Sequence, residues 1–261
     1  MMLRNFPKVF LILAIAVSAA AAPAPAWAKK KPPAPPTQPP EPPAASAAAE
    51  DLPCPSGTTL HQTKSERHCF RPGSYTKEGH WIFWYDNGQK KADSEYVGGK
   101  RHGKRLFWFE NGQLKEESTW KHDEYEGKLT LYYKNGKKEK EVEYKAGKEH
   151  GMFRSWDDKG NKKEESGWKD GKRDGKTFFW FANGQKQEEV DYKTGKTDGA
   201  HVWFWENGKK KTESHFAMGR KNGLSTEWTT QGHFVRSICF RDHEERWRSE
   251  DENQVKSKGC N

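Results

Sequence analysis

Hydrophobic and polar positions recur along most of the chain in a pattern with a period of 24 residues. Residues 84–96 read WYDNGQKKADSEY, residues 108–120 read WFENGQLKEESTW, and residues 180–192 read WFANGQKQEEVDY. Each stretch begins with an aromatic pair before Asn-Gly and ends in another aromatic after a run of Lys and Glu. Self-similarity at a fixed period of about 20 to 50 residues is typical of a stacked array, in which each unit buries surface against its neighbours.

A glycine marks the same point in every unit. An aromatic residue stands four positions before each of these glycines and another stands eight positions after it. A second glycine recurs fifteen positions after the first in all units except the last. The marking glycines are Gly88, Gly112, Gly136, Gly160, Gly184, Gly208 and Gly232.

Each unit predicts a β-hairpin, because Asn-Gly between aromatic or β-branched runs is the strongest short hairpin signal and both residues tolerate φ > 0. We expect the second glycine to close a longer turn into the next hairpin. No segment keeps a 3.6-residue period of hydrophobic positions. We therefore expect helix only in residues 1–28, which we predict to be removed as a signal peptide. The predicted fold is all-β, an elongated meander of about seven stacked hairpins that forms a rod-like single sheet.

The turn type decides which residues share a face of this sheet. A three-residue loop with a bulge would place both aromatic columns on one face, with a Ser or Val column between them. A two-residue type I′ turn would put them on opposite faces. We favour the bulged turn because it makes a single aromatic stripe. The acids five positions after each glycine should then form cross-strand ion pairs with Lys on the other face: Asp93, Glu117, Glu141, Glu165, Glu189 and Glu213.

The pattern of aromatic-aromatic-x-Asn-Gly, then Glu, aromatic and Gly, resembles the bacterial variant of the MORN repeat over about residues 75 to 243. The resemblance implies a rod of β-hairpins that binds proteins or lipids, and it extends to a repeat family named after antitoxins. The fourth unit departs from the pattern at Ser155 and Asp157, and the seventh at Glu227 and Thr229. An exported chain would also depart from the cytoplasmic role of an antitoxin.

The N-terminal residues predict export. Arg4 and Lys8 precede an apolar run, and Ala26, Trp27 and Ala28 fit a small-x-small cleavage site, so residues 1–28 resemble a signal peptide. The alternative is an uncleaved N-terminal anchor. Residues 29–50 contain eight prolines and predict an extended linker. We expect an N-terminal cap at 51–79, the repeat array at 80–240, a C-terminal cap or tail at 241–261, and a periplasmic, cell-surface or extracellular protein.

Four cysteines lie outside the regular array. In an exported chain an even number predicts disulfides, with free or metal-bound thiols as the alternative. Seven hairpins at about 10 Å each would separate the ends by roughly 70 Å, and a disulfide needs Cα atoms within about 7 Å. A rod therefore predicts two local bridges that staple the ends, Cys54–Cys69 and Cys239–Cys260.

The charge balance does not favour a nucleic-acid partner. Of 46 basic residues, two lie in residues 1–28, which leaves 44 against 37 acidic residues, or +7. Both signs are mixed along the chain, whereas nucleic-acid binders concentrate Lys and Arg on one face. Ser118 with Lys121, and Ser166 with Lys169, match the S-x-x-K motif, but they fall at a strand end rather than on a helix. We therefore expect no catalytic residue, no metal site and no cofactor.

A basic column twelve positions after the glycines suggests a binding surface. It should lie in equivalent turns along one edge of the rod, interrupted by Glu124. Solvated turn chemistry is the plain alternative. Our first hypothesis is a secreted, non-enzymatic scaffold that binds an unknown protein; the second is a cell-envelope module that binds anionic lipid or polysaccharide through this edge. The candidate partner-binding residues are Lys100, Lys148, Lys172, Lys196 and Arg220.

Overall fold

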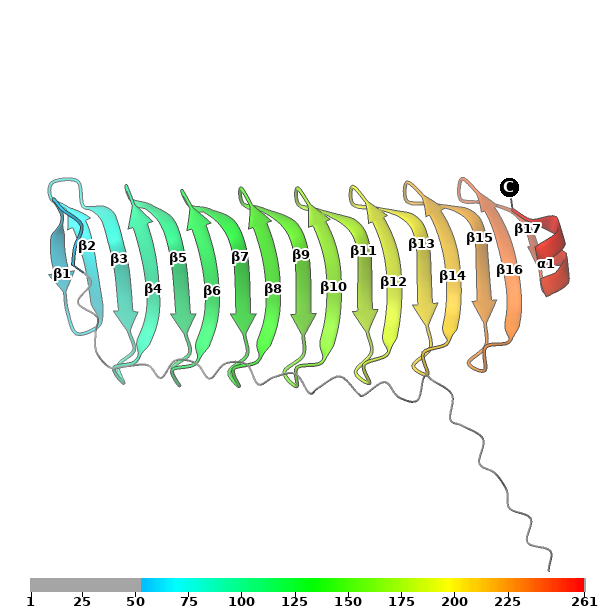
Figure 1. Cartoon of the computed structure of the whole chain (residues 1–261), viewed down its shortest axis with the longest axis horizontal. Coiled ribbons are helices and arrows are strands. Elements are labelled where there is room, and N and C mark those ends of the chain that lie inside the picture. Colours follow the sequence, from blue (N-terminus) through cyan, green and yellow to red (C-terminus); the bar gives the residue numbers. More distant parts are fainter. Residues whose placement is uncertain (1–52, 261) are drawn as a thin grey trace, which may run out of the picture. The chain divides into compact units, whose positions relative to one another are not determined.

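The computed structural model describes residues 53–260, so the expected signal peptide and the proline-rich linker lie outside the described residues. Seventeen strands form one sheet in which each strand pairs antiparallel with the next along the chain (Figure 1). The all-β meander predicted from the repeat is therefore confirmed. None of the described helices is long and apolar enough to span a membrane.

The strands from the third to the sixteenth have eight or nine residues each, as the fixed period requires. Their bounds are β1 (Thr59–Gln62), β2 (Glu66–Arg71), β3 (Thr76–Trp84), β4 (Lys90–Val97), β5 (Lys100–Trp108), β6 (Leu114–Lys121), β7 (Glu124–Tyr132), β8 (Lys138–Lys145), β9 (Lys148–Trp156), β10 (Lys162–Lys169), β11 (Lys172–Trp180), β12 (Lys186–Lys193), β13 (Lys196–Phe204), β14 (Lys210–Ala217), β15 (Arg220–Trp228), β16 (Phe234–Arg241) and β17 (Glu244–Ser249).

The turn at each marking glycine is the three-residue loop with a bulge. At the first of them, the Tyr85 amide donates to the Gln89 carbonyl at 2.8 Å, and the Gly88 amide donates to the Tyr85 carbonyl at 2.9 Å. Gly88 has a φ of 84°, whereas Asn87 is not among the residues with positive φ. The bulged turn was correctly predicted, but the asparagine is not there for its backbone conformation.

The turn between successive hairpins is shorter than expected. Ala146 and Gly147 both have positive φ, 48° and 72°, and the flanking Lys145 and Lys148 pair directly. This is the geometry of a two-residue type I′ turn. The longer turn closed by the second glycine was therefore wrong.

The second glycine instead lies inside a strand. Gly151 occupies a bulge in β9 with a φ of 96°. A side chain there would collide with the carboxylate of Glu143, which accepts a hydrogen bond from the Met152 amide at 3.2 Å. A residue without Cβ is needed at this point both for the backbone conformation and for the space.

The predicted single aromatic stripe is also wrong. Trp84 pairs with Lys90, but Phe83 pairs with Ala92, so one extra residue in β4 shifts the register. Because successive side chains alternate between faces, Trp84 and Tyr96 lie on opposite faces of the sheet. The aromatic column before each turn shares its face with the acids, here called the ion-pair face. The later aromatic column shares the other face, here called the serine face, with the small residues.

Small side chains at the middle of the strands are the most completely buried residues. Ser118 and Ser166 are 0% exposed, and Val142 and Val190 are 1% exposed. Aromatic rings cover this column: the indole nitrogen of Trp120 donates to Ser118 Oγ at 2.9 Å. The sheet thus buries a thin central column in place of a thick aliphatic core.

Hydrogen bonds between equivalent turns join each unit to the next. The side-chain amide of Asn135 donates to the Asp158 carbonyl at 2.7 Å, while its Oδ1 accepts from the Lys137 amide at 3.0 Å. Four other asparagines repeat the inter-unit bond: Asn87, Asn111, Asn183 and Asn207. The asparagine of the Asn-Gly pair therefore sets the stacking of units, a role that the hairpin signal alone does not reveal.

Both ends of the sheet are closed by the predicted disulfides, Cys54–Cys69 and Cys239–Cys260, each with Cα atoms 5.6 Å apart. The C-terminal end also carries the helix α1 (Glu252–Lys258), capped by the Asp251 side chain. The expectation that helix is confined to the N-terminal signal is therefore wrong. Seven residues were too few to show a helical period.

Removing one period should leave a folded protein, since each unit contacts mainly its neighbours. We expect the deletion of residues 137–160 to keep both disulfides and the β-sheet circular dichroism, and to shorten the particle by about 10 Å in small-angle scattering. Deletion of residues 137–158 is the control, because it breaks the 24-residue register and should destabilise the sheet strongly. Similar stability of the two deletions would contradict stacking in register.

Substitution of the stacking asparagine should cost stability at the turn. Asn135→Ala removes both of its hydrogen bonds, and we expect a loss of about 1 kcal/mol in the free energy of unfolding. Asn135→Asp keeps the acceptor for the Lys137 amide but loses the donor of the inter-unit bond. The decrease in its free energy of unfolding therefore measures the contribution of the inter-unit bond alone. Urea unfolding at constant pH measures both, and wild-type stability of Asn135→Asp would show that the inter-unit bond contributes nothing.

Candidate functional site

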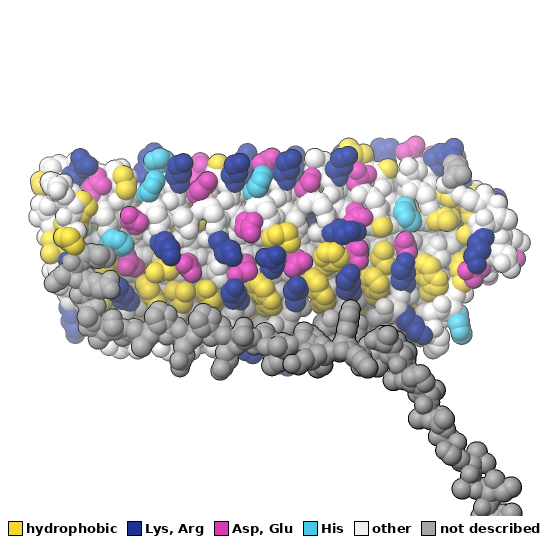
Figure 2. Space-filling view, viewed as in Figure 1, with side chains coloured by type: hydrophobic (Ala, Val, Ile, Leu, Met, Phe, Trp, Pro, Cys, Tyr) yellow, Lys and Arg dark blue, Asp and Glu magenta, His cyan; other side chains and the backbone are white. Residues whose placement is uncertain are grey.

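The candidate binding residues lie along the long edge of the sheet that carries the two-residue turns. Lys100, Lys148, Lys172, Lys196 and Arg220 are the first residues of β5, β9, β11, β13 and β15, and all five are exposed. Each follows its turn directly. Figure 2 shows Lys and Arg side chains along the upper long edge, with Asp and Glu between them. The structure therefore places the predicted column on one edge, in equivalent positions.

A second basic column, missed from the sequence, stands opposite the first. The residue before each turn is Lys in four consecutive units, Lys121, Lys145, Lys169 and Lys193. Three of these face a lysine across the turn, in the pairs Lys145–Lys148, Lys169–Lys172 and Lys193–Lys196. We call these six residues the lysine-pair edge. This lysine column stands nine positions after the marking glycines, so it could have been recognised in the sequence. It was missed because the longer turn that we expected would not have placed these lysines opposite the candidate binding residues.

Within the described part of the chain, the six lysines of the lysine-pair edge form no ion pairs of their own. Among residues 53–260, no ion pair or side-chain hydrogen bond of these six lysines is found. Like charges directly opposite each other destabilise a sheet. Three such pairs in successive units place six lysines in a stretch of about 20 Å. The acids nearby have other contacts: Glu126 and Asp174 accept hydrogen bonds from the turn amides of Ala146 and Thr194, and Asp170 lies 3.4 Å from His150.

The edge becomes mixed in charge on the N-terminal side of these pairs. Lys121 faces Glu124 across its turn, and Asp123 binds the Arg101 guanidinium at 2.9 Å. On the C-terminal side, Ala217 faces Arg220. The basic stretch therefore has an end, and it is not a uniform feature of the repeat.

The acids on the ion-pair face behave differently, because each is paired. Glu141 lies 2.6 Å from Lys138 and 3.7 Å from Lys128, and Glu189 lies 3.0 Å from both Lys186 and Lys176. Burial raises the pKa of these carboxyl groups, but hydrogen bonds and charges from the lysines lower it more, so the net pKa lies below its usual range. The predicted cross-strand ion pairs are confirmed for five of the six acids, whereas Glu213 pairs with Lys210 of its own strand. This face is therefore occupied by its own charges.

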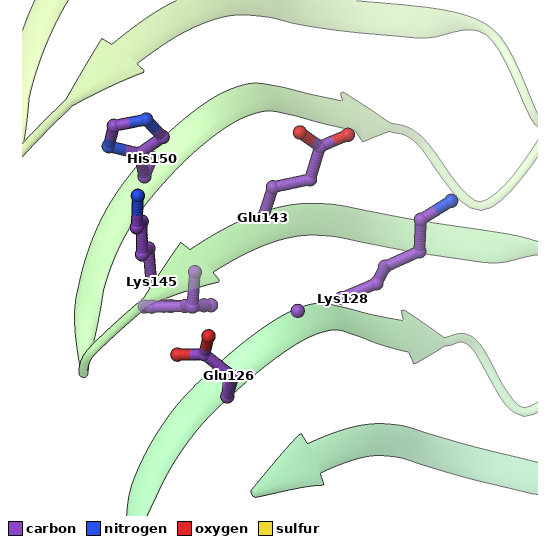
Figure 3. Close-up of a pocket in the computed structure, with 7 residues that line it drawn as sticks. Glu126, Lys128, Glu143, Lys145 and His150 are labelled. Atoms are coloured by element: carbon purple, nitrogen blue, oxygen red, sulfur yellow. The ribbon is translucent and has the colours of Figure 1, made fainter. Parts of the chain in front are cut away.

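An open hollow of about 500 Å³ lies between β7, β8 and β9, beside the first lysine pair. Figure 3 shows His150, Lys145 and Glu126 at its turn end, with Lys128 directed away from them. Glu126 accepts a hydrogen bond from the Ala146 amide at 2.8 Å and so holds the turn. Its carboxylate therefore has a structural contact, and the hollow extends the lysine-pair edge onto the sheet.

The S-x-x-K motifs are structural in this fold. The Ser118 hydroxyl donates to Glu116 at 3.0 Å and accepts from the Trp120 indole, and Lys121 extends from the opposite face of the strand. A fully buried serine separated from its lysine by the sheet cannot act as an activated nucleophile. Nor do three His, Cys, Asp or Glu side chains gather into a metal-binding group within the part of the chain that the structure describes.

Comparison with known families identifies the repeat. The family model described as MORN repeat variant matches residues 77–97, 101–122, 125–146, 173–194 and 197–217. The unmatched interval contains the unit with Ser155 and Asp157, which departs from the aromatic pattern. No curated protein matches the chain. This fold is a repeat scaffold and not a known enzyme fold.

The paired acids predict the pH dependence of stability. Glu141, Glu165 and Glu189 all have a pKa lowered in the folded state. Their contribution is therefore complete above the unfolded pKa of about 4.3 and is lost as the pH falls through the lower folded pKa. The test compares the wild type with a triple variant in which these three residues are replaced by Gln, by urea unfolding from pH 7 to pH 3. The variant should have the lower free energy of unfolding at pH 7, and the difference from the wild type should shrink at low pH. Parallel pH curves would refute the assignment.

Proposed function

The chain is a MORN-repeat protein, and on that premise we propose that it is an exported, non-enzymatic scaffold that binds another protein. MORN repeats are modules that bind proteins or lipids. The lysine-pair edge is the docking surface, and the partner presents an acidic segment to it. The observation that carries this proposal is the run of three lysine pairs without internal ion partners.

The charge of this edge favours an anionic partner. Carboxylates placed between the paired lysines would relieve the repulsion across each turn and add attraction that depends on salt. Single exposed contacts of this kind are weak. The sheet holds three pairs at steps of about 10 Å, so the contacts add without further ordering of the scaffold.

The limited extent of the basic stretch favours a protein over a uniform polymer. Three rows span about 20 Å, which an extended peptide covers with six or seven residues. The acids at Asp123 and Glu124 would repel a polyanion that continued along the edge, but they suit a partner with its own charge pattern.

Export is supported by the disulfides. Both cysteine pairs are bonded in the structure, and such bonds persist in oxidising compartments. The predicted signal at residues 1–28 points the same way. The proline-rich linker would then present the scaffold away from its point of attachment or release.

A cell-envelope module that binds anionic lipid or polysaccharide is the second candidate. It is favoured by the wider basic column, because Lys100 and Arg220 extend the same edge beyond the lysine pairs. Polybasic surfaces bind anionic headgroups with about 1 kcal/mol per residue near the surface. Both candidates use one edge, so the ligand class decides between them.

Charge reversal of the lysine-pair edge tests the proposal. Replacing all six lysines by Glu should weaken binding to poly-L-glutamate at least tenfold at 0.15 M salt. Thermal stability should change little, because the exchanged side chains are exposed and each turn still carries a like-charged pair. The matched control reverses six exposed lysines on the three-residue-turn side, and it should bind like the wild type: Lys91, Lys115, Lys134, Lys159, Lys163 and Lys211.

Vesicles containing phosphatidylglycerol separate the two candidates. Stronger edge-dependent binding to these vesicles than to poly-L-glutamate would favour the lipid module. Equal loss of binding in the control variant would mean that net charge, and not the arrangement of the edge, attracts the ligand. That result would remove the basis of both candidates.

A further inference from the structure

A second surface, unrelated to the lysine-pair edge, lies at the N-terminal end of the sheet. It is an open hollow of about 220 Å³, and every residue that lines it is aromatic: His61, His68, Phe70, Tyr75 and Trp81. These residues come from β1, β2, the following turn and β3. We call this the aromatic hollow.

The rings of the aromatic hollow form two stacks. His68 stacks on His61 with centroids 4.7 Å apart and on Trp81 at 3.9 Å, with interplanar angles of 28° and 20°. Phe70 and Tyr75 form the other stack, with centroids 5.5 Å apart and an angle of 20°. The His68–Phe70 contact, with centroids 6.2 Å apart, joins the stacks. The hollow therefore offers flat ring surfaces at roughly fixed spacing.

Tyr75 is held in an exposed position. Its side chain is 77% exposed, while its amide donates to the Arg71 carbonyl at 3.0 Å and its φ is 53°. Burial lowers the pKa of His68, although the Glu66 charge raises it, so this ring is neutral near pH 7. The Lys77 ammonium lies 4.1 Å from the centroid of the Trp81 ring, so the surface is not free of charge, but its rings are preformed and open to solvent, which suits a ligand.

Aromatic-lined grooves are the recognition sites of polyproline II helices. Such a ligand is already extended, so little entropy is lost on binding, and its proline rings lie against aromatic side chains. Few other extended peptides match a surface that consists of rings alone.

The chain contains a segment of this chemistry just before its described residues. Residues 32–43 read PPAPPTQPPEPP. A polyproline II helix has three residues per turn. Pro33, Pro36, Pro39 and Pro42 are spaced by three, so they would form one continuous ridge along such a helix.

We propose that residues 32–43 bind in the aromatic hollow of their own chain as a polyproline II helix. Nine residues, 44–52, connect the segment to Pro53 and can span up to about 30 Å. Cys54 is bonded to Cys69, whose neighbours His68 and Phe70 line the hollow from the opposite face of β2. The linker therefore has only to pass around β1, which is the edge strand of the sheet.

Attachment in the same chain compensates for a modest affinity. A short flexible connection gives an effective concentration in the millimolar range. Occupancy of the hollow would shorten the reach of the linker and cover the rings beside the exposed edge of β1. An open strand edge invites pairing with other chains, so the bound segment would also protect this end.

Binding of the segment in trans tests the proposal. The probe is a fluorescent peptide of residues 29–46, measured by anisotropy against the full chain from Lys29 onward. In a second form, here called the proline-free chain, all eight prolines of residues 32–43 are replaced by Ser while the prolines from Pro53 onward are kept. This substitution should leave the hollow empty. We expect the peptide to bind this form at least tenfold more tightly than the wild-type chain, where the attached segment competes.

Two variants of the proline-free chain locate the binding site. His61→Ala with Tyr75→Ala should weaken peptide binding at least tenfold, and circular dichroism checks that the exposed substitutions preserve the fold. Trp203→Ala, at a 38% exposed ring of the repeat array, is the matched control and should bind like its parent.

Three results would overturn the proposal. The peptide could fail to bind the proline-free chain, or it could bind equally well after substitution of His61 and Tyr75. Equal binding to the wild-type and proline-free chains would show that the attached segment does not occupy the hollow. Concentration-dependent dimers of the wild type that vanish in the proline-free form would place the segment in a second copy, against binding within one chain.

Discussion

Hydrogen bonds between equivalent turns are the constraint on which this structure depends. Each stacking asparagine reaches a carbonyl of the next unit, so the asparagine and its acceptor must recur at a fixed interval. On the opposite edge, backbone amides of the two-residue turns reach back to the preceding unit, as the Gly147 amide donates to the carbonyl of Tyr125 in β7 at 2.9 Å. A residue inserted in one unit would break both series. The absence of insertions between the marking glycines follows from this constraint and not from any demand of chemistry.

The same constraint turns single charges into extended surfaces. A lysine beside one turn is an ordinary solvated residue, but at a fixed interval it becomes part of a row. On the ion-pair face the rows alternate in sign, and carboxylates such as Glu141 are neutralised where they stand. On the edge, the rows at Lys169 and Lys172 have the same sign and no internal partner among the described residues. Pairing, and not the amount of charge, separates the structural face from the candidate binding edge.

The sequence predicted the features that repeat and missed those that depend on one extra residue. The period and the ion pairs follow from residue types at fixed spacing, and both disulfides follow from the length of the rod. The bulged turn at Gly88 was predicted correctly, but on the basis of an aromatic stripe that the structure does not have. The aromatic stripe failed because Lys91 adds a residue to β4 and reverses the faces beyond it. The lysine pairs were missed because Gly151 was assigned to a turn when it occupies a strand bulge. Register errors of one residue change faces in a sheet, and spacing alone cannot detect them.

The two ends of the sheet differ in how their edge strands are protected from pairing with other chains. At the C-terminal end, β17 carries charged residues and α1 is tied back by Cys260, which discourages pairing with another strand. At the N-terminal end, β1 has only four residues, all exposed, and none of them is Lys, Arg, Asp or Glu. Its disulfide fixes the chain but leaves the aromatic rings open. An array that grows by adding identical units needs different caps, because one end presents the first strand of a unit and the other presents the last. At the C-terminal end this protection comes from α1 and its disulfide, whereas at the N-terminal end our proposal assigns it to residues 32–43.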